Sequence, residues 1–113
     1  MLKVDADREQ VTVIARAEGR IDSGSAQEFQ AALENVIQPE DKALVIDFEH
    51  VSYISSAGMR VILLTAKTLQ RQGGQLALCS LTEPIREVFK ISGFDNIIAI
   101  HETRADATAA VSQ

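Results

Sequence analysis

The stretch ALVIDFEHVSYISSAGMRVILLTAKTLQRQGG, residues 43–74, decides the fold of this chain. Its first six residues form a nearly continuous apolar run rich in β-branched side chains, which is typical of a strand covered on both faces. A serine pair follows, and from residue 56 the apolar residues recur at the spacing of a helix that ends at Gly73 and Gly74. A buried strand that leads into a helix predicts an α/β fold, because a parallel return requires a crossover.

Strand and helix patterns continue on both sides of this stretch. They predict, in order, a hairpin of strands at 2–6 and 11–19 with its turn at 7–10, a helix at 26–37 capped by Ser23 or Ser25, a strand at 75–80, a short helix at 83–92, a strand at 96–100 and a final helix at 104–111. A chain of 113 residues is long enough for one core. We therefore predict a single α/β domain over residues 1–113, with a mixed, mainly parallel sheet of about five strands and helices packed on it.

Composition and charge exclude several classes of protein. The 16 acidic residues outnumber the 11 basic ones, and a net charge of −5 argues against direct binding of nucleic acid. No apolar stretch approaches the length of a bilayer span, and the acidic start does not resemble a secretory signal, so we expect no membrane insertion. The single cysteine, Cys79, cannot form an internal disulfide. These features predict a cytoplasmic protein.

The helix that begins near residue 56 has two distinct sides on a helical wheel. The side expected to pack on the sheet carries Val61, Ile62, Thr65, Ala66 and Leu69, with Met59 at its margin. The opposite side carries a narrow basic stripe of Arg60, Lys67 and Arg71, flanked by Leu63 and Leu64. Two leucines beside an exposed basic stripe suggest a surface that binds a partner.

The two serines at the start of this helix have different expected roles. Ser55 projects toward the buried side and is the simplest cap for a free backbone N–H. Ser56 then projects to solvent one turn before Arg60, where the helix dipole and free N–H groups favour an anion. A phosphate on Ser56 would bring about −1.5 to −2 charges and would disturb a partner docked over Leu63 and Leu64.

Two longer strings of the sequence resemble a known family. They are GRIDSGSAQEFQAAL at residues 19–33 and LVIDFEHVSYISSAGMRVILLTAKTLQRQGGQLALCSLTEPIREVFKISGFDNIIAIHET at 44–103. The GRID turn, the LVIDF strand, the serine turn with Gly58, the glycine pair and the VFKISGF segment follow one another in the order and spacing of the STAS domain of bacterial anti-sigma factor antagonists. The chain therefore resembles that family over nearly its whole length.

The resemblance implies a phosphorylation switch. In this family the serine two positions before the turn glycine is phosphorylated by a kinase that is also the anti-sigma factor, and that position is Ser56. The unphosphorylated antagonist binds the kinase and releases its sigma factor, the phosphorylated one lets go, and a metal-dependent serine phosphatase resets it. Family members often read Asp-Ser-Ser-Gly or Asp-Ser-Thr-Gly at the turn, whereas this chain reads Ser-Ser-Ala-Gly at residues 55–58, so Ser55 remains an alternative acceptor.

The resemblance also implies where the partner binds. The kinase holds the ATP, so the resemblance implies no cofactor for this chain. The family uses an aspartate in the turn after the second strand, which is Asp22 here, although Asp22 could instead cap the first helix. The expected partner-binding residues are Asp22, Ser23, Ser55, Ser56, Ala57, Gly58, Arg60, Leu63, Leu64 and Lys67.

Other functions have weaker support in the sequence. A structural STAS subunit of a membrane lipid transporter or a signalling scaffold would use the same helix side without phosphorylation. A hydrolase triad of Ser56, His50 or His101, and Asp22 lacks a G-x-S-x-G elbow, and two distant histidines with one cysteine do not form a metal site. Asp47 ends the apolar run, but the acidic cluster of an aspartyl-phosphate site is missing. We therefore predict a binding module rather than an enzyme.

Overall fold

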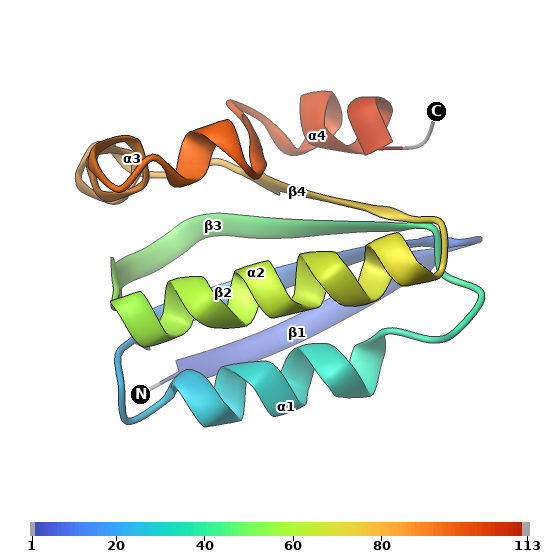
Figure 1. Cartoon of the computed structure of the whole chain (residues 1–113), viewed down its shortest axis with the longest axis horizontal. Coiled ribbons are helices and arrows are strands. Elements are labelled where there is room, and N and C mark those ends of the chain that lie inside the picture. Colours follow the sequence, from blue (N-terminus) through green and yellow to red (C-terminus); the bar gives the residue numbers. More distant parts are fainter. Residues whose placement is uncertain (1, 112–113) are drawn as a thin grey trace.

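A mixed five-stranded sheet forms the centre of the protein in a computed structural model, which describes residues 2–111 (Figure 1). The strands follow one another across the sheet in chain order: β1 (Leu2–Glu9), β2 (Thr12–Ile21), β3 (Ala43–Ile54), β4 (Gln75–Cys79) and β5 (Ala99–His101). β1 and β2 form an antiparallel hairpin, and all other neighbours are parallel. The predicted α/β class and the mixed, mainly parallel sheet are confirmed.

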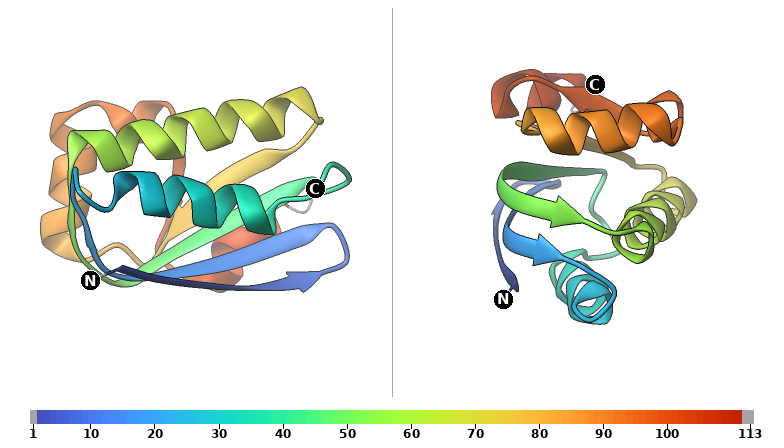
Figure 2. Two further views of the ribbon diagram at one scale, coloured as in Figure 1. Left: turned by 90° about the horizontal axis from the view of Figure 1, so that it is seen from below. Right: turned by 90° about the vertical axis from the view of Figure 1, so that its left-hand side faces the viewer.

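The helices cover both faces of this sheet. They are α1 (Ala26–Val36), α2 (Ser56–Arg71), α3 (Glu83–Ile91) and α4 (Arg104–Val111), with a short 3-10 turn, η1 (Phe94–Asn96), after α3. α1 and α2 lie side by side along one face, as Figure 2 shows, and α4 packs on β3 and β4 from the other side. α3 joins the main core through Ile85 and Phe89, whose ring meets Phe48 edge-on.

The apolar run of β3 lies at the centre of the core. All six residues from Ala43 to Phe48 are buried, because side chains that alternate along the strand face helices on both sides of the sheet. Leu44, Ile46 and Phe48 belong to the core under α1 and α2, whereas Ala43 and Val45 belong to a smaller one under α4. The continuous apolar pattern of residues 43–48 therefore reflects burial of the strand on both faces of the sheet, as predicted.

Some element boundaries differ from those predicted. The hairpin turn consists of Gln10, which has a φ of +59°, and Val11, and does not extend over residues 7–10. The fifth strand begins at Ala99 rather than at residue 96, because Phe94–Asn96 forms a 3-10 turn. The helix exit at the glycine pair is confirmed: Gly73 has a φ of +76°, and Gly74 N donates to Leu69 O at 2.7 Å. Among residues 2–111, no helix has both the length and the hydrophobicity needed to cross a membrane.

A buried carboxylate, that of Asp41, lies at the end of the sheet opposite the serine turn. Asp41 is fully buried; its Oδ2 is 2.6 Å from Arg8 Nη2 and accepts from Gln38 N at 2.7 Å. Hydrogen bonds from Arg8, reinforced by Gln38 N–H and the charge of Arg8, outweigh burial and hold the pKa of Asp41 below its ordinary 3.8. The contacts therefore favour the ionised form of Asp41.

This carboxylate predicts a pH-dependent stability. Because the pKa of Asp41 is lower in the folded chain than in the unfolded one, its stabilisation is present above pH 3.8 and is lost as the pH falls through the folded pKa. We expect the free energy of urea unfolding to fall from about pH 5 to about pH 2, and to fall less in Asp41→Asn. A wild-type pH slope in Asp41→Asn would contradict the prediction.

Candidate functional site

The turn between β3 and α2 uses Ser55 as a structural cap. Ser55 Oγ accepts a hydrogen bond from Gly58 N at 3.2 Å, which satisfies one of the free N–H groups at the helix start. Ser55 N donates to Ile21 O at 2.8 Å and ties the turn to the end of β2. The capping role predicted for Ser55 is confirmed, and its hydroxyl is already engaged.

Ser56 is the first residue of α2 and is exposed to solvent. Within residues 2–111, no hydrogen-bond partner is found for its hydroxyl. Arg60 follows one turn later and is also exposed. The free N–H groups and the positive dipole end of α2 favour negative charge at this position. Ser56 is therefore a free hydroxyl at a site that tolerates an anion.

An open hollow of about 300 Å³ lies beside Ser56. Its lining comes from the first turns of α2 and from the segment after α3. The lining residues are Ser56, Met59, Arg60, Leu63, Ser92 and Phe94. The hydroxyl of Ser56 thus stands beside a concave, largely apolar surface.

The two sides of α2 agree with the helical wheel. The side chains predicted to pack on the sheet are buried or half-buried, and the three basic ones, Arg60, Lys67 and Arg71, are exposed. The two leucines, however, face different hollows. Leu63 is half-buried beside Ser56, whereas Leu64 is 44% exposed and lines a second hollow of about 220 Å³ between α1 and α2.

Asp22 stabilises the loop that leads into α1. Its Oδ1 accepts from Ser25 N at 2.9 Å, and Asp22 N donates to Ser25 Oγ at 3.0 Å. Ser25 Oγ also donates to Asp22 Oδ1 at 3.1 Å, and this bond together with the one from Ser25 N–H lowers the pKa of the Asp22 carboxyl and keeps it ionised. Ser25 is the N-cap residue of α1, and Ser23 is exposed in the same loop. The loop adjoins the serine turn through the bond between Ser55 and Ile21.

An arginine and a tyrosine that we did not single out from the sequence also lie at this edge. The guanidinium of Arg20 stands 4.4 Å from the centre of the Tyr53 ring. The two residues pair across β2 and β3 because the register shifts just before Arg20, between Gly19 and Arg20. Both side chains are exposed, and they extend the polar edge of the site beyond Asp22.

The other candidate groups do not assemble around Ser56. His50 is exposed, with its Nε2 at 3.8 Å from Glu49 Oε1. His101 pairs with Cys79 across β4 and β5. Cys79 is fully buried, and that burial raises the pKa of its thiol. The part of the chain that the structure describes contains no group of three or more side chains suited to hold a metal ion.

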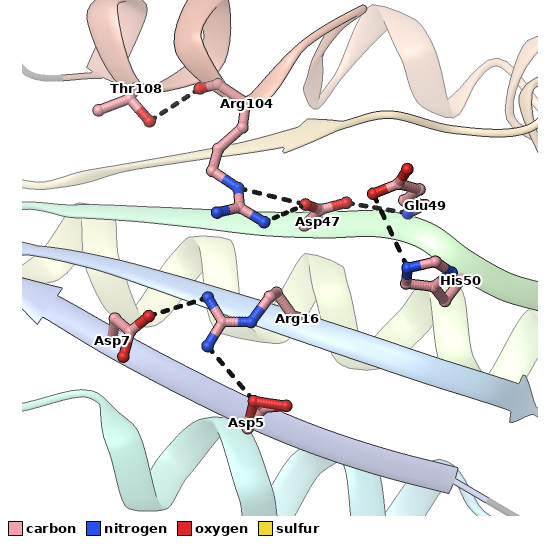
Figure 3. Close-up of polar contacts among 8 residues, drawn as sticks. All are labelled: Asp5, Asp7, Arg16, Asp47, Glu49, His50, Arg104 and Thr108. Carbon is pink, nitrogen blue, oxygen red and sulfur yellow. Dashed lines mark hydrogen bonds and ion pairs between the residues drawn. The ribbon is translucent and has the colours of Figure 1, made fainter.

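Asp47 is engaged in structural contacts. Its Oδ2 is 2.8 Å from Arg104 Nη2 of α4, and its Oδ1 accepts from Glu49 N at 2.9 Å (Figure 3). The side chain is 5% exposed, so these contacts leave little room for modification. The ion pair connects α4 to β3, on the face of the sheet away from α1 and α2.

These features define a small α/β domain that presents a free serine at the start of a helix. Residues 3–107 match the family model of the STAS domain. BtrV of Bordetella bronchiseptica, a protein provisionally assigned as an anti-sigma factor antagonist, is 38% identical over 109 residues, which are 96% of this chain and 94% of BtrV. The chain belongs to the STAS-domain family of anti-sigma factor antagonists.

Solved structures share this fold at lower identity. A crystal structure of an anti-sigma factor antagonist from Mycobacterium paratuberculosis matches with a TM-score of 0.89 and 22% identity, over 100% of this chain and 96% of that one. The Bacillus cell fate determinant SpoIIAA in its phosphorylated form matches with a TM-score of 0.71 and 22% identity, over 96% of this chain and 98% of its own. At these identities the likeness concerns the fold.

Proposed function

We infer that this protein is an anti-sigma factor antagonist whose binding is switched off by phosphorylation of Ser56. In the unphosphorylated state it binds an anti-sigma factor that is also a serine kinase, and the sigma factor is released. The observation that carries this proposal is that the two serines have different roles. Ser55 Oγ caps α2 by accepting a hydrogen bond from Gly58 N at 3.2 Å, and Ser56 is exposed beside Arg60. A kinase can therefore modify Ser56 without removing the cap.

The relatives support the class of partner. Proteins named as anti-sigma factor antagonists match along nearly the whole chain, and SpoIIAA has been solved in both a phosphorylated and an unphosphorylated form. By analogy with the antagonist family, a metal-dependent serine phosphatase removes the phosphate, and the kinase, not this chain, binds the ATP. We place the protein in the cytoplasm, where sigma factors act, as a binding module rather than an enzyme.

The site can hold a phosphate without unfolding. A phosphoryl group on Ser56 would lie at the positive end of α2, one turn from Arg60, and would bring about −1.5 to −2 charges. The phosphate would instead weaken binding of the partner, because a doubly charged group in a docked interface must be desolvated and repels nearby carboxylates.

The proposed binding surface spans the turn, the loop before α1 and the exposed side of α2. Ser55 N–H bonded to Ile21 O holds the loop with Asp22 and Ser23 against the turn. At 1.5 Å per residue, Lys67 lies roughly 16 Å along α2 from Ser56, so the surface has the reach of a protein interface. The residues are Asp22, Ser23, Ser55, Ser56, Ala57, Gly58, Arg60, Leu63, Leu64 and Lys67; Gly58 is buried against Ile21 and would support the turn rather than contact the partner.

Phosphosite mapping tests this proposal directly. We expect mass spectrometry of the chain isolated from its native cells to place phosphate on Ser56 and not on Ser55. With the cognate kinase and ATP, Ser56→Ala should not be phosphorylated. Ser55→Ala should still accept phosphate on Ser56, although loss of the cap costs about 1 kcal/mol of stability. Phosphate on Ser55, or on neither serine under every growth condition, would contradict the switch and favour a permanent scaffold.

A further inference from the structure

The surface beside Ser56 continues from α2 onto the segment that follows α3. Ser92 and Phe94 line the hollow together with Ser56 and Leu63. Gly93 between them has a φ of +77°, a left-handed conformation that lets the chain turn sharply after α3. The end of α3 and the start of η1 therefore both border the hollow.

Two isoleucines that flank this segment in the chain are unusually exposed. Ile91, the last residue of α3, is 79% exposed, and Ile97, just after η1, is 63% exposed; both values exceed those of every other large apolar residue in the described chain. On a helical wheel, Val88 and Ile91 share the flank of α3 that leads to Ser92, while Phe89 points into the core. Exposed apolar side chains on a segment that also lines a hollow are typical of interaction sites.

The hollow itself is lined by one charged side chain, which is basic although the chain as a whole has a net charge of −5. Arg60 lines the hollow and is exposed, whereas the exposed carboxylates Glu87 and Asp95 of α3 and η1 are not among its lining residues. Among residues 2–111, Arg60 is in no ion pair. A partner that matches this surface would place an apolar side chain in the hollow and a carboxylate near Arg60.

We propose that the anti-sigma factor inserts an apolar side chain, flanked by a carboxylate, into the hollow between Ser56 and Phe94 and packs against Ile91 and Ile97. The inference rests on the proposed function, because continuity with Ser56 identifies the occupant. A phosphoryl group on Ser56 would stand at the mouth of the hollow, where it meets both the inserted side chain and its neighbouring carboxylate. The α3–η1 segment would thus supply affinity, and Ser56 would control it.

Calorimetry with full-length chains tests this surface. The probe is the anti-sigma factor kinase that binds the wild-type chain, chosen from those of the same genome and titrated without ATP so that Ser56 stays unmodified. The double variant Ile91→Ser, Ile97→Ser should bind at least about tenfold more weakly. Val11→Ser is the matched control, because Val11 is 42% exposed in the hairpin turn at the other end of the sheet and should keep wild-type affinity. Thermal unfolding of all variants should be similar.

The possible results separate the two proposals. Wild-type affinity in the double isoleucine variant, together with loss of binding on phosphorylation of Ser56, would overturn this inference and leave the proposed function intact. If the double variant changed only self-association in sedimentation experiments, the isoleucines would serve a second copy of the chain, which also overturns it. If no anti-sigma factor kinase bound the wild-type chain, that result would contradict both the proposed function and this inference.

Discussion

Phosphorylation of Ser56 is expected to weaken binding of the anti-sigma factor more than about a hundredfold, which corresponds to about 3 kcal/mol. Ser56→Glu carries one charge instead of about two, so we expect a smaller loss, of at least about tenfold. Ser56→Ala should bind as tightly as the wild type and should stay bound in the presence of ATP. Calorimetry with the purified kinase measures all three.

The physical reason for this prediction lies in the surroundings of Ser56. Its hydroxyl is exposed, so the added group does not disturb the fold, and Arg60 with the start of α2 can hold it in place. Gln70→Glu is a suitable control, because it adds one negative charge to the exposed side of α2, roughly 21 Å from residue 56 along the helix axis. Equal affinity of the Ala, Glu and phosphorylated chains would contradict the switch.

Sequence reasoning succeeded where local periodicity decides the structure. The wheel separated the buried and basic sides of α2, and capping rules distinguished Ser55 from Ser56, because both depend only on residues within a few turns of one another. The apolar run of β3 likewise predicted a central strand buried on both faces. Local patterns therefore place the candidate hydroxyl correctly within the fold.

Features that depend on distant segments were not predictable in this way. The hollow beside Ser56 exists because Ser92 and Phe94 return to the start of α2, and no local pattern gives that placement. Arg20 meets Tyr53 only because irregularities shift the register of β2 against β3. Leu63 and Leu64 are adjacent in sequence, yet the position of α1 places them at separate hollows.

Gly58→Ala is expected to destabilise the protein by about 1–2 kcal/mol and to weaken partner binding. A Cβ at this position would lie 2.6 Å from Ile21 Cγ2, 3.0 Å from Ile54 Cγ1 and 3.2 Å from Ile21 O. Alanine is intrinsically better in a helix by about 1 kcal/mol, but overpacking a tight core costs about 1–3 kcal/mol. The clash should dominate, because Ile21 is fully buried and its carbonyl oxygen is fixed by the bond from Ser55 N.

Relief of this clash requires the start of α2 to move away from β2, and that movement links stability to function. It would stretch the 2.8 Å bond from Ser55 N to Ile21 O and displace both Ser56 and the hollow beside it. Chemical denaturation and calorimetry should therefore show a loss of stability and of affinity together. Gly24→Ala is the matched control, because its Cβ would meet only Asp22 Oδ1, at an ordinary 3.4 Å. Wild-type stability in Gly58→Ala would mean that helix propensity outweighs the contact, and that α2 does not need this close approach to β2.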